Sequence, residues 1–283
     1  MLFLGVDIEF RVPKSFKSAR STRPLVFHSI NKSGSLSLIK TLINSHASNI
    51  YVAHNYDDIM IHLKNFRKSH RALVMGHDLY QGFKPREYEL MTQVRNPVAR
   101  VVSIWSWFHK KQSEGLLEEP LEDFSDFIRN TDKLFWYSMV AQFAVPFDLP
   151  RELRRQIAYK FDPNAAVASA LHKLDRDFKF LTVAERFEES LFVVSSDRKC
   201  KKLKVWHRDQ RNPKRPLLES LDKSELRVLK KNIEYDFELY DYGCRRLSEQ
   251  SKWFQGTSHL ALYKQACQKQ YKEVIDCELM ERE

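Results

Sequence analysis

Short apolar runs, rich in β-branched and aromatic side chains, recur along the first third of the chain, at residues 25–30, 49–54, 72–75 and 90–94. Runs of this length between polar segments predict buried strands. Apolar residues then repeat at helical spacing after the second run, in residues 57–66, and after the fourth, in residues 98–111. Strands that alternate with helices favour an α/β fold, with a parallel sheet covered by helices on both faces.

The middle of the chain has a mainly helical pattern, which covers residues 124–180. Asp123 or Ser125 can accept a hydrogen bond from the first helical turn, so either residue is a candidate N-cap. An apolar run at residues 179–183 predicts one more strand, and residues 188–194 predict the helix that follows it.

The last clear amphipathic pattern predicts one long helix over residues 224–246, which begins near Asp222 and Ser224. The residues beyond it have a weaker helical pattern, and no shift in composition marks a boundary between domains. We therefore expect a lead-in, a single α/β domain and a helical tail packed on that domain, at residues 1–23, 24–247 and 248–283.

Composition narrows the choice of partner and compartment. The chain has 283 residues, of which 43% are hydrophobic, and its formal net charge is +10. It can bury a substantial core, and its charge favours an anionic partner such as a nucleotide, a nucleic acid, an acidic polysaccharide or an anionic lipid. The four cysteines lack C-x-x-C spacing, which indicates reduced thiols. Residues 1–23 contain neither a signal-peptide core nor a membrane span, so we expect a soluble, cytoplasmic protein.

The junction after the first predicted strand has the residue types of a phosphate-binding loop. Residues 31–37 read N-K-S-G-S-L-S, and apolar residues at helical spacing follow. Backbone N–H groups of such a loop and of the first helical turn lack intrahelical partners, and the helix dipole adds positive potential. Lys32 adds a full charge, although the loop is not a Walker A motif, because Lys32 precedes its only glycine. The alternative is structural: Ser35 caps the helix and Gly34 forms a turn.

Two further candidates follow other predicted strands, whose carboxyl ends meet at one edge of a parallel sheet. Arg95 ends the strand at 90–94, and Ser103 comes eight residues later, about two helical turns on. An arginine and a hydroxyl that converge there would suit a second phosphate. His77 follows Gly76 at another strand end, and histidine is the usual general base near neutral pH. Taken singly, Arg95 also suits a surface ion pair, Ser103 a packing position and His77 a structural or exposed side chain.

Two other groups of residues favour structural roles. Glu185 and Arg186 are interpreted as an ion pair that stabilises the fold. The aromatic residues Trp105, Trp107 and Phe108 are interpreted as core residues, with one of them in the cleft.

Together, the motifs resemble the PAPS-dependent sulfotransferases, most closely the carbohydrate branch that includes the heparan sulfate 2-O-sulfotransferases and their bacterial relatives. The order is K-S/T-G-S/T-x-S, then a strand-end G-H, then R-D/N-P-x-x-R-x-x-S. Residues 181–191 and 232–247 resemble later segments of the family, so the resemblance spans residues 24–247. Asn31 stands where the family has proline. Leu36 replaces a hydroxyl residue, which removes one expected contact to phosphate or sulfate.

The resemblance implies a P-loop-like fold and transfer of a sulfuryl group from PAPS to a hydroxyl or amine of a carbohydrate-like acceptor. It implies that Lys32 stabilises the leaving phosphate and that His77 is the general base. The residues that it implies for binding PAPS are Lys32, Ser33, Gly34, Ser35, Ser37, Arg95, Ser103, Arg211 and Arg215. The acceptor can be anionic, and no nucleic-acid partner is implied. No metal is expected, since the sequence has no cluster with metal-ligand spacing.

Alternatives stay open at this point. An ATP-dependent small-molecule kinase is disfavoured by the missing G-K-S/T and by the lack of an obvious Mg²⁺-binding aspartate after a strand. A non-enzymatic protein that binds nucleic acid or glycan would use the positive charge, although no recognised nucleic-acid motif occurs. A family member that keeps the fold without the activity is a further alternative, given Leu36. The identity of the acceptor and the oligomeric state do not follow from the sequence.

Overall fold

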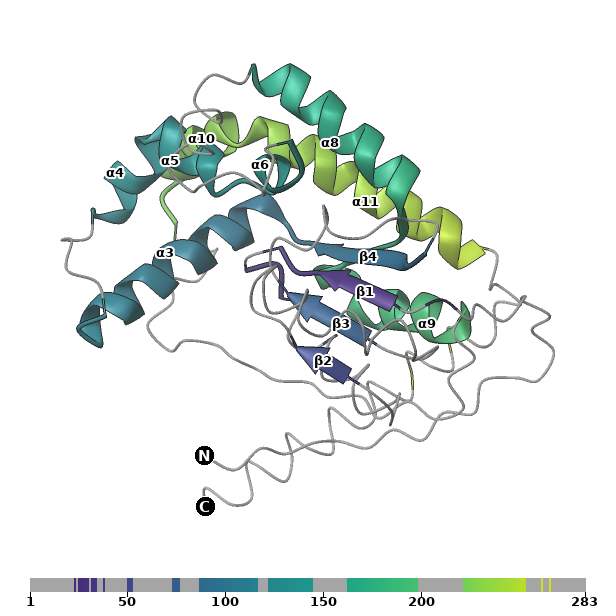
Figure 1. Ribbon diagram of the computed structural model, residues 1–283. Coiled ribbons are helices and arrows are strands. Elements are labelled where there is room, and N and C mark those ends of the chain that lie inside the picture. Colours follow the sequence, from purple (N-terminus) through teal and green to yellow (C-terminus); the bar gives the residue numbers. More distant parts are fainter. Residues whose placement is uncertain are drawn as a thin grey trace.

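The computed structural model describes residues 23, 25–30, 32–34, 38, 50–52, 73–76, 87–116, 122–144, 162–197, 221–252, 261 and 265. The described strands form one parallel sheet in the order β2-β3-β1-β4-β5 (Figure 1). They are β1 (Leu25–His28), β2 (Ile50–Val52), β3 (Leu73–Gly76), β4 (Glu89–Val94) and β5 (Phe178–Val183). Each lies within two residues of a strand predicted from the apolar runs, so the parallel α/β sheet is confirmed.

The described helices are α3 (Pro97–Ser113), α4 (Phe124–Arg129), α5 (Thr131–Trp136), α6 (Met139–Ala144), α8 (Pro163–Asp177), α9 (Phe187–Asp197), α10 (Lys223–Asn232) and α11 (Glu234–Lys252), with a 3₁₀ turn, η2 (Ala184–Arg186), after β5. Of the two candidate caps of α4, Asp123 is the one used: its side chain accepts a hydrogen bond from Asp126 N at 2.8 Å. The helix predicted at residues 57–66 lies outside the described residues.

Both faces of the centre of the sheet are covered. All side chains of β1 and β4 are buried, and successive side chains of a strand point to opposite faces. In Figure 1, α8 and α11 run together above β4, and α9 lies behind the strands. Gly243 of α11 packs directly on the sheet, because a Cβ atom there would lie 2.7 Å from Val94 Cγ2 and 3.6 Å from Leu181 Cδ2. The lack of a side chain at this position lets the helix approach β4 and β5 closely.

The single helix expected over residues 224–246 is wrong, because the structure has two helices there, α10 and α11. They meet at Ile233, which is buried and has a non-helical backbone with φ of −124° and ψ of 23°. Just before the break, Asn232 Nδ2 donates a hydrogen bond to Ile128 O at 2.9 Å. Just after it, Asp236 binds the start of α6. These tertiary contacts on both sides of Ile233 override a helical pattern that is continuous in the sequence.

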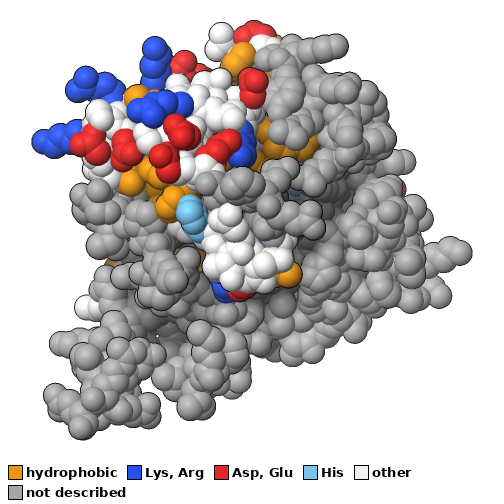
Figure 2. All heavy atoms as spheres, turned by 90° about the vertical axis from the view of Figure 1, so that its left-hand side faces the viewer, with side chains coloured by type: hydrophobic (Ala, Val, Ile, Leu, Met, Phe, Trp, Pro, Cys, Tyr) orange, Lys and Arg blue, Asp and Glu red, His pale blue; other side chains and the backbone are white. Residues whose placement is uncertain are grey.

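A second, smaller apolar cluster joins α3, α4, α5 and α10, and its buried members are Val98, Val101, Ile104, Phe127, Ile128, Leu134, Leu229 and Ile233. Figure 2 views the molecule from this end, and its described residues show basic side chains beside acidic ones. Several basic residues on α3, α4 and α5 form ion pairs: Lys110 with Glu114, Arg129 with Asp126, and Lys133 with Glu122. The described part of this face therefore lacks the continuous basic surface that is typical of nucleic-acid-binding proteins.

Candidate functional site

A tight loop follows β1. Lys32 and Gly34 both have left-handed backbone conformations, with φ of 62° and 79°. Ser33, between them, is buried and donates twice to the carbonyl oxygen of Ile30, from its backbone N at 3.2 Å and from its hydroxyl at 2.8 Å. Leu38 is helical and buried. The predicted order of strand, loop and helix is thus confirmed at the positions that the structure describes here.

Two side chains at the end of β4 donate hydrogen bonds to backbone carbonyl groups of this loop. Gln93 Nε2 donates to Ser33 O at 2.9 Å, and Arg95 Nη1 donates to Lys32 O at 3.1 Å. The C=O and N–H groups of a trans peptide point in opposite directions. Because the Ser33 carbonyl accepts from Gln93, the N–H of Gly34 in the same peptide points away from Gln93. A loop N–H group beside a lysine is an arrangement that suits an anion.

The side chain of Lys32 lies against α3. Its Nζ atom is 5.3 Å from the centroid of the Trp107 ring. Trp107 is 40% exposed, whereas Trp105 and Phe108 pack against the smaller apolar cluster. Two of the three aromatic residues thus pack in the core, as predicted, and the position of the third in a cleft stays a prediction. The contact makes α3 a wall beside the loop.

Arg95 stands at the junction of β4 and α3. Its Nε atom is 3.9 Å from Glu185 Oε1, which also accepts a hydrogen bond from Asn96 N at 3.1 Å. Asn96 in turn caps α3, since its side chain accepts from Ala99 N at 3.1 Å. Tyr240 of α11 donates to the other oxygen of Glu185 at 3.3 Å. Glu185 therefore connects the end of β5 to the start of α3 and orients Arg95.

The prediction that Glu185 and Arg186 pair with each other is wrong, because each forms an ion pair with a different residue. Glu185 faces Arg95, whereas Arg186 Nη2 lies 2.5 Å from Glu189 Oε1. Arg186 also donates to Ser248 Oγ at 2.7 Å, which ties η2 to α11. Adjacent residues on a 3₁₀ turn point in different directions, so each finds its own partner.

A buried ion pair beneath α3 was not predicted from the sequence. Arg100 and Asp236 are each 1% exposed, and Nη1 of the arginine lies 3.7 Å from Oδ2 of the aspartate. The Asp236 carboxylate also accepts hydrogen bonds from Met139 N and Val140 N, both at 3.0 Å. Burial raises the pKa of Asp236, while the Arg100 charge and the two N–H donors oppose this rise. The pair joins α3, α6 and α11 behind the site. The available signal was a charged residue among the apolar positions of α3.

Comparison with known proteins now identifies the chain. A model of the sulfotransferase family matches residues 19–243. The chain belongs to the sulfotransferase family. The match confirms the family that the motifs resemble, the PAPS-dependent sulfotransferases, and with it the enzyme class. The matched region contains the Lys32 loop, Arg95 and Ser103.

Among solved structures, this sulfotransferase is similar to the mouse sulfotransferase SULT7A1 complexed with PAP. The two chains share 16% sequence identity, the similarity covers 82% of this chain and 90% of the other, and the TM-score is 0.45. No curated protein matches the chain.

The remaining predicted site residues divide into two groups. Ser103 lies in the second turn of α3 and is partly buried. Arg95 lies two residues before the start of the same helix. The others lie outside the described residues: Ser35, Ser37, His77, Arg211 and Arg215. Gln93 contacts Ser33 and Glu185 contacts Arg95, and neither contact was predicted from the sequence. Gln93 is one of three polar residues in β4, so it gave no distinct signal.

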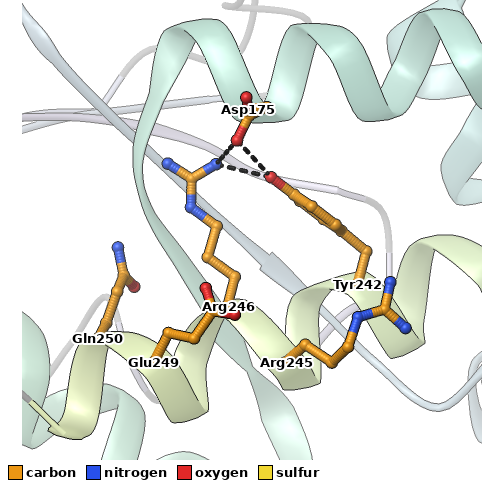
Figure 3. A pocket seen from close by; sticks show the side chains of 6 residues that line it. All are labelled: Asp175, Tyr242, Arg245, Arg246, Glu249 and Gln250. Carbon is orange, nitrogen blue, oxygen red and sulfur yellow. Dashed lines mark hydrogen bonds and ion pairs between the residues drawn. The ribbon is translucent and has the colours of Figure 1, made fainter.

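A hollow between α8 and α11 is separate from this site (Figure 3). It is lined by Asp175, Tyr242, Arg245, Arg246, Glu249 and Gln250. Arg246 donates to Tyr242 Oη at 2.9 Å and to Phe178 O at 2.6 Å, and Tyr242 donates to Asp175 at 2.9 Å. Phe178 begins β5, whereas the Lys32 loop follows the carboxyl end of β1. None of the predicted site residues lines the hollow, and its polar side chains connect α8, α11 and β5.

No group of three or more potential metal ligands occurs among the residues that the structure describes. Within the same residues, no helix is long and apolar enough to cross a membrane.

Proposed function

We propose that this sulfotransferase moves a sulfuryl group from PAPS to a hydroxyl or amine of a carbohydrate-like acceptor. The observation that carries the proposal is the loop after β1. There, Gln93 and Arg95 donate to two successive carbonyl groups, so that the Gly34 N–H, next to Lys32, points away from Gln93. This arrangement supports binding of the 5′-phosphosulfate at the loop.

In this proposal, Lys32 contacts the 5′-phosphosulfate and stabilises the negative charge on the bridging oxygen as it leaves. Gly34 N–H, Ser35 and Ser37 hold the 5′-phosphate. Ser33 belongs to the same loop, but its single hydroxyl donor is engaged by Ile30, so its part is to fix the loop from within.

The second phosphate of the nucleotide is assigned to Arg95 and Ser103, on either side of the start of α3. Arginine suits this role because its planar guanidinium can bind phosphate through two donors at once. Glu185 holds Arg95 at 3.9 Å before the nucleotide arrives. Arg211 and Arg215 are proposed to close over the bound nucleotide.

The proposed reaction gives a step to His77 and a step to Lys32. His77 takes the proton of the acceptor hydroxyl, and the acceptor oxygen attacks sulfur in line with the bond to the bridging oxygen. That bond breaks, its electrons stay on the phosphate of PAP, and Lys32 stabilises the charge. Positioning and charge stabilisation supply much of the catalysis, as in phosphoryl transfer. A placed general base adds about 10²–10⁴-fold.

The acceptor class, the cytoplasmic location and the domain organisation are part of the same proposal. A catalytic domain at residues 24–247 is supported by the family match over residues 19–243.

The direct test measures formation of PAP from PAPS with a panel of desulfated heparan-type oligosaccharides as acceptors. We expect turnover by the wild type and only a small residual rate in Lys32→Ala, which removes the charge at the leaving oxygen. His77→Ala should lower the rate and leave PAP affinity nearly unchanged. Full activity in Lys32→Ala would overturn the proposal, and full activity in His77→Ala would remove the base assignment alone.

A further inference from the structure

The backbone of Lys32 is fixed, whereas a lysine side chain has four rotatable bonds. The carbonyl of Lys32 accepts a hydrogen bond from Arg95, and its φ is 62°. These constraints set where the side chain leaves the loop but not where the ammonium group ends. A second element must fix the ammonium if it is to stand at the leaving oxygen before the reaction begins.

We infer that Trp107 is a positioning residue for Lys32. Its indole face holds the Lys32 ammonium beside the loop, so that the charge is in place when PAPS binds. This rests on the proposed role of Lys32 and adds a residue that none of the sequence motifs contains.

The geometry is that of a cation–π contact. Lys32 Nζ is 5.3 Å from the centre of the Trp107 ring, within the range of about 6 Å over which the ring quadrupole attracts a cation. Tryptophan gives the strongest such contact among the aromatic side chains. The ring is itself braced, since its centre lies 5.2 Å from that of Phe108 at an interplanar angle of 62°. Phe108 packs in turn against Tyr137, with ring centres 5.3 Å apart.

Burial does not explain a tryptophan at this position. Among the residues that the structure describes, Trp107 and Leu116 are the only large apolar side chains that are exposed. Trp105 and Phe108, on the same helix, pack against the smaller apolar cluster. A half-exposed ring contributes little to the packing of the core. Its exposed face can contact a cation and shield one side of that cation from water. The exposure also means that Trp107 can be replaced without unfolding the chain.

The contact itself is testable by NMR of the full chain with ¹³C-labelled lysine, without any substrate. Protons above an aromatic ring are shifted upfield, so the Lys32 ε-methylene should lie upfield in the wild type. It should return to the random-coil position in Trp107→Leu and stay partly shifted in Trp107→Phe. Lys32→Met identifies the signal. An unshifted Lys32 signal in the wild type would overturn the inference whatever the enzyme does.

The role in catalysis is tested by a double-mutant cycle on the rate of PAP formation from PAPS. Trp107→Leu should lower the rate about 2- to 5-fold, the size of an exposed cation–π contact, and Trp107→Phe should recover part of it. In the Lys32→Met background, Trp107→Leu should have no further effect, because the ring then has no cation to hold. Leu116→Ala, the matched exposed apolar position, should leave the rate unchanged.

The outcomes separate the inference from the proposed function. Equal losses from Trp107→Leu with and without Lys32 would overturn the inference and leave the sulfotransferase proposal intact. A normal rate in Lys32→Met would instead overturn the role of Lys32, and with it the reason to position Lys32. A wild type that binds neither PAPS nor PAP would overturn the proposed function, and the positioning role with it.

Discussion

Arg100 and Asp236 face each other in the interior, with 3.7 Å between Nη1 and Oδ2 and 1% of each residue exposed. The aspartate also caps the start of α6 through Met139 N and Val140 N. Its position depends on the break at Ile233, after which α11 begins. One carboxylate thereby joins three helices behind the site, and α3, which carries Trp107 and Ser103, is held in place from below.

The pair should matter most when only one partner is removed. Asp236→Ala leaves the Arg100 charge buried without this carboxylate, and we expect a loss of about 3–5 kcal/mol of unfolding free energy. Arg100→Met with Asp236→Asn should cost less than the sum of the single changes, because the two sites are in contact and the asparagine can still accept from α6. Urea unfolding monitored by circular dichroism measures each value. Additive losses would show that the two residues act independently.

The left-handed conformation of Gly34 predicts a separation between stability and binding. Gly34→Ala puts a side chain at φ of 79° and should cost about 1–2 kcal/mol, and the distorted loop should bind PAP more weakly. Gly115 is the matched control, since its φ is 69° and nothing lies within 4 Å of its Cβ position. Gly115→Ala should cost a similar stability, with PAP affinity unchanged in calorimetry. Equal PAP affinity in the two variants would remove the loop from the site.

Gln93 should act through the loop that it holds. Gln93→Leu removes the donor to Ser33 O and leaves a buried carbonyl without this partner, which costs about 1–3 kcal/mol. We expect PAP affinity to fall along with stability, because the peptide that carries the Gly34 N–H is no longer held in its orientation. Thr182→Val, which removes another buried hydrogen bond to the sheet at Thr92 O, should lower stability alone. Titration calorimetry with PAP at a temperature where every variant is folded distinguishes the two effects.

The thiol of Cys244 should react slowly. Burial raises its pKa, so at pH 8 the folded protein has less thiolate at this position than an ordinary cysteine. The rate of alkylation by iodoacetamide, followed by peptide mapping, should therefore be lower in the native chain than in urea, and should increase steeply as the pH rises. A native rate equal to that in urea would mean that α11 opens at this position.

The sequence predicted the sheet well, because the residues of its central strands, β1 and β4, are buried and mostly apolar. It also singled out Lys32, Gly34 and Arg95, which the structure brings together, because strand ends and glycine are local signals. It did not predict the break at Ile233, because the amphipathic pattern continues across it and the cause lies in contacts of Asn232 and Asp236 with distant helices.

Contacts between segments far apart in the chain could not be predicted from the sequence either. Arg95 and Glu185 are 90 positions apart in the sequence, and Arg186 was the nearer candidate partner for the glutamate. Trp107 was one of three neighbouring aromatic residues that only the packing of α3 separates. The sequence shows which side chains are charged or aromatic, but the fold determines which of them are in contact.

The central claim is that the Lys32 loop and Arg95 bind a nucleotide with phosphates at both the 5′ and 3′ positions. The most direct test is thermal unfolding of the full chain with adenosine 3′,5′-bisphosphate, with 5′-AMP and ATP plus Mg²⁺ as controls. At 100 times its dissociation constant the bisphosphate should stabilise the protein by about 2.7 kcal/mol, which is about 5–10 °C in Tm for a chain of this size. We predict that shift with the bisphosphate, little with 5′-AMP, and none with the bisphosphate in Arg95→Ala. No shift with any nucleotide, or an equal shift with ATP and Mg²⁺, would contradict the account.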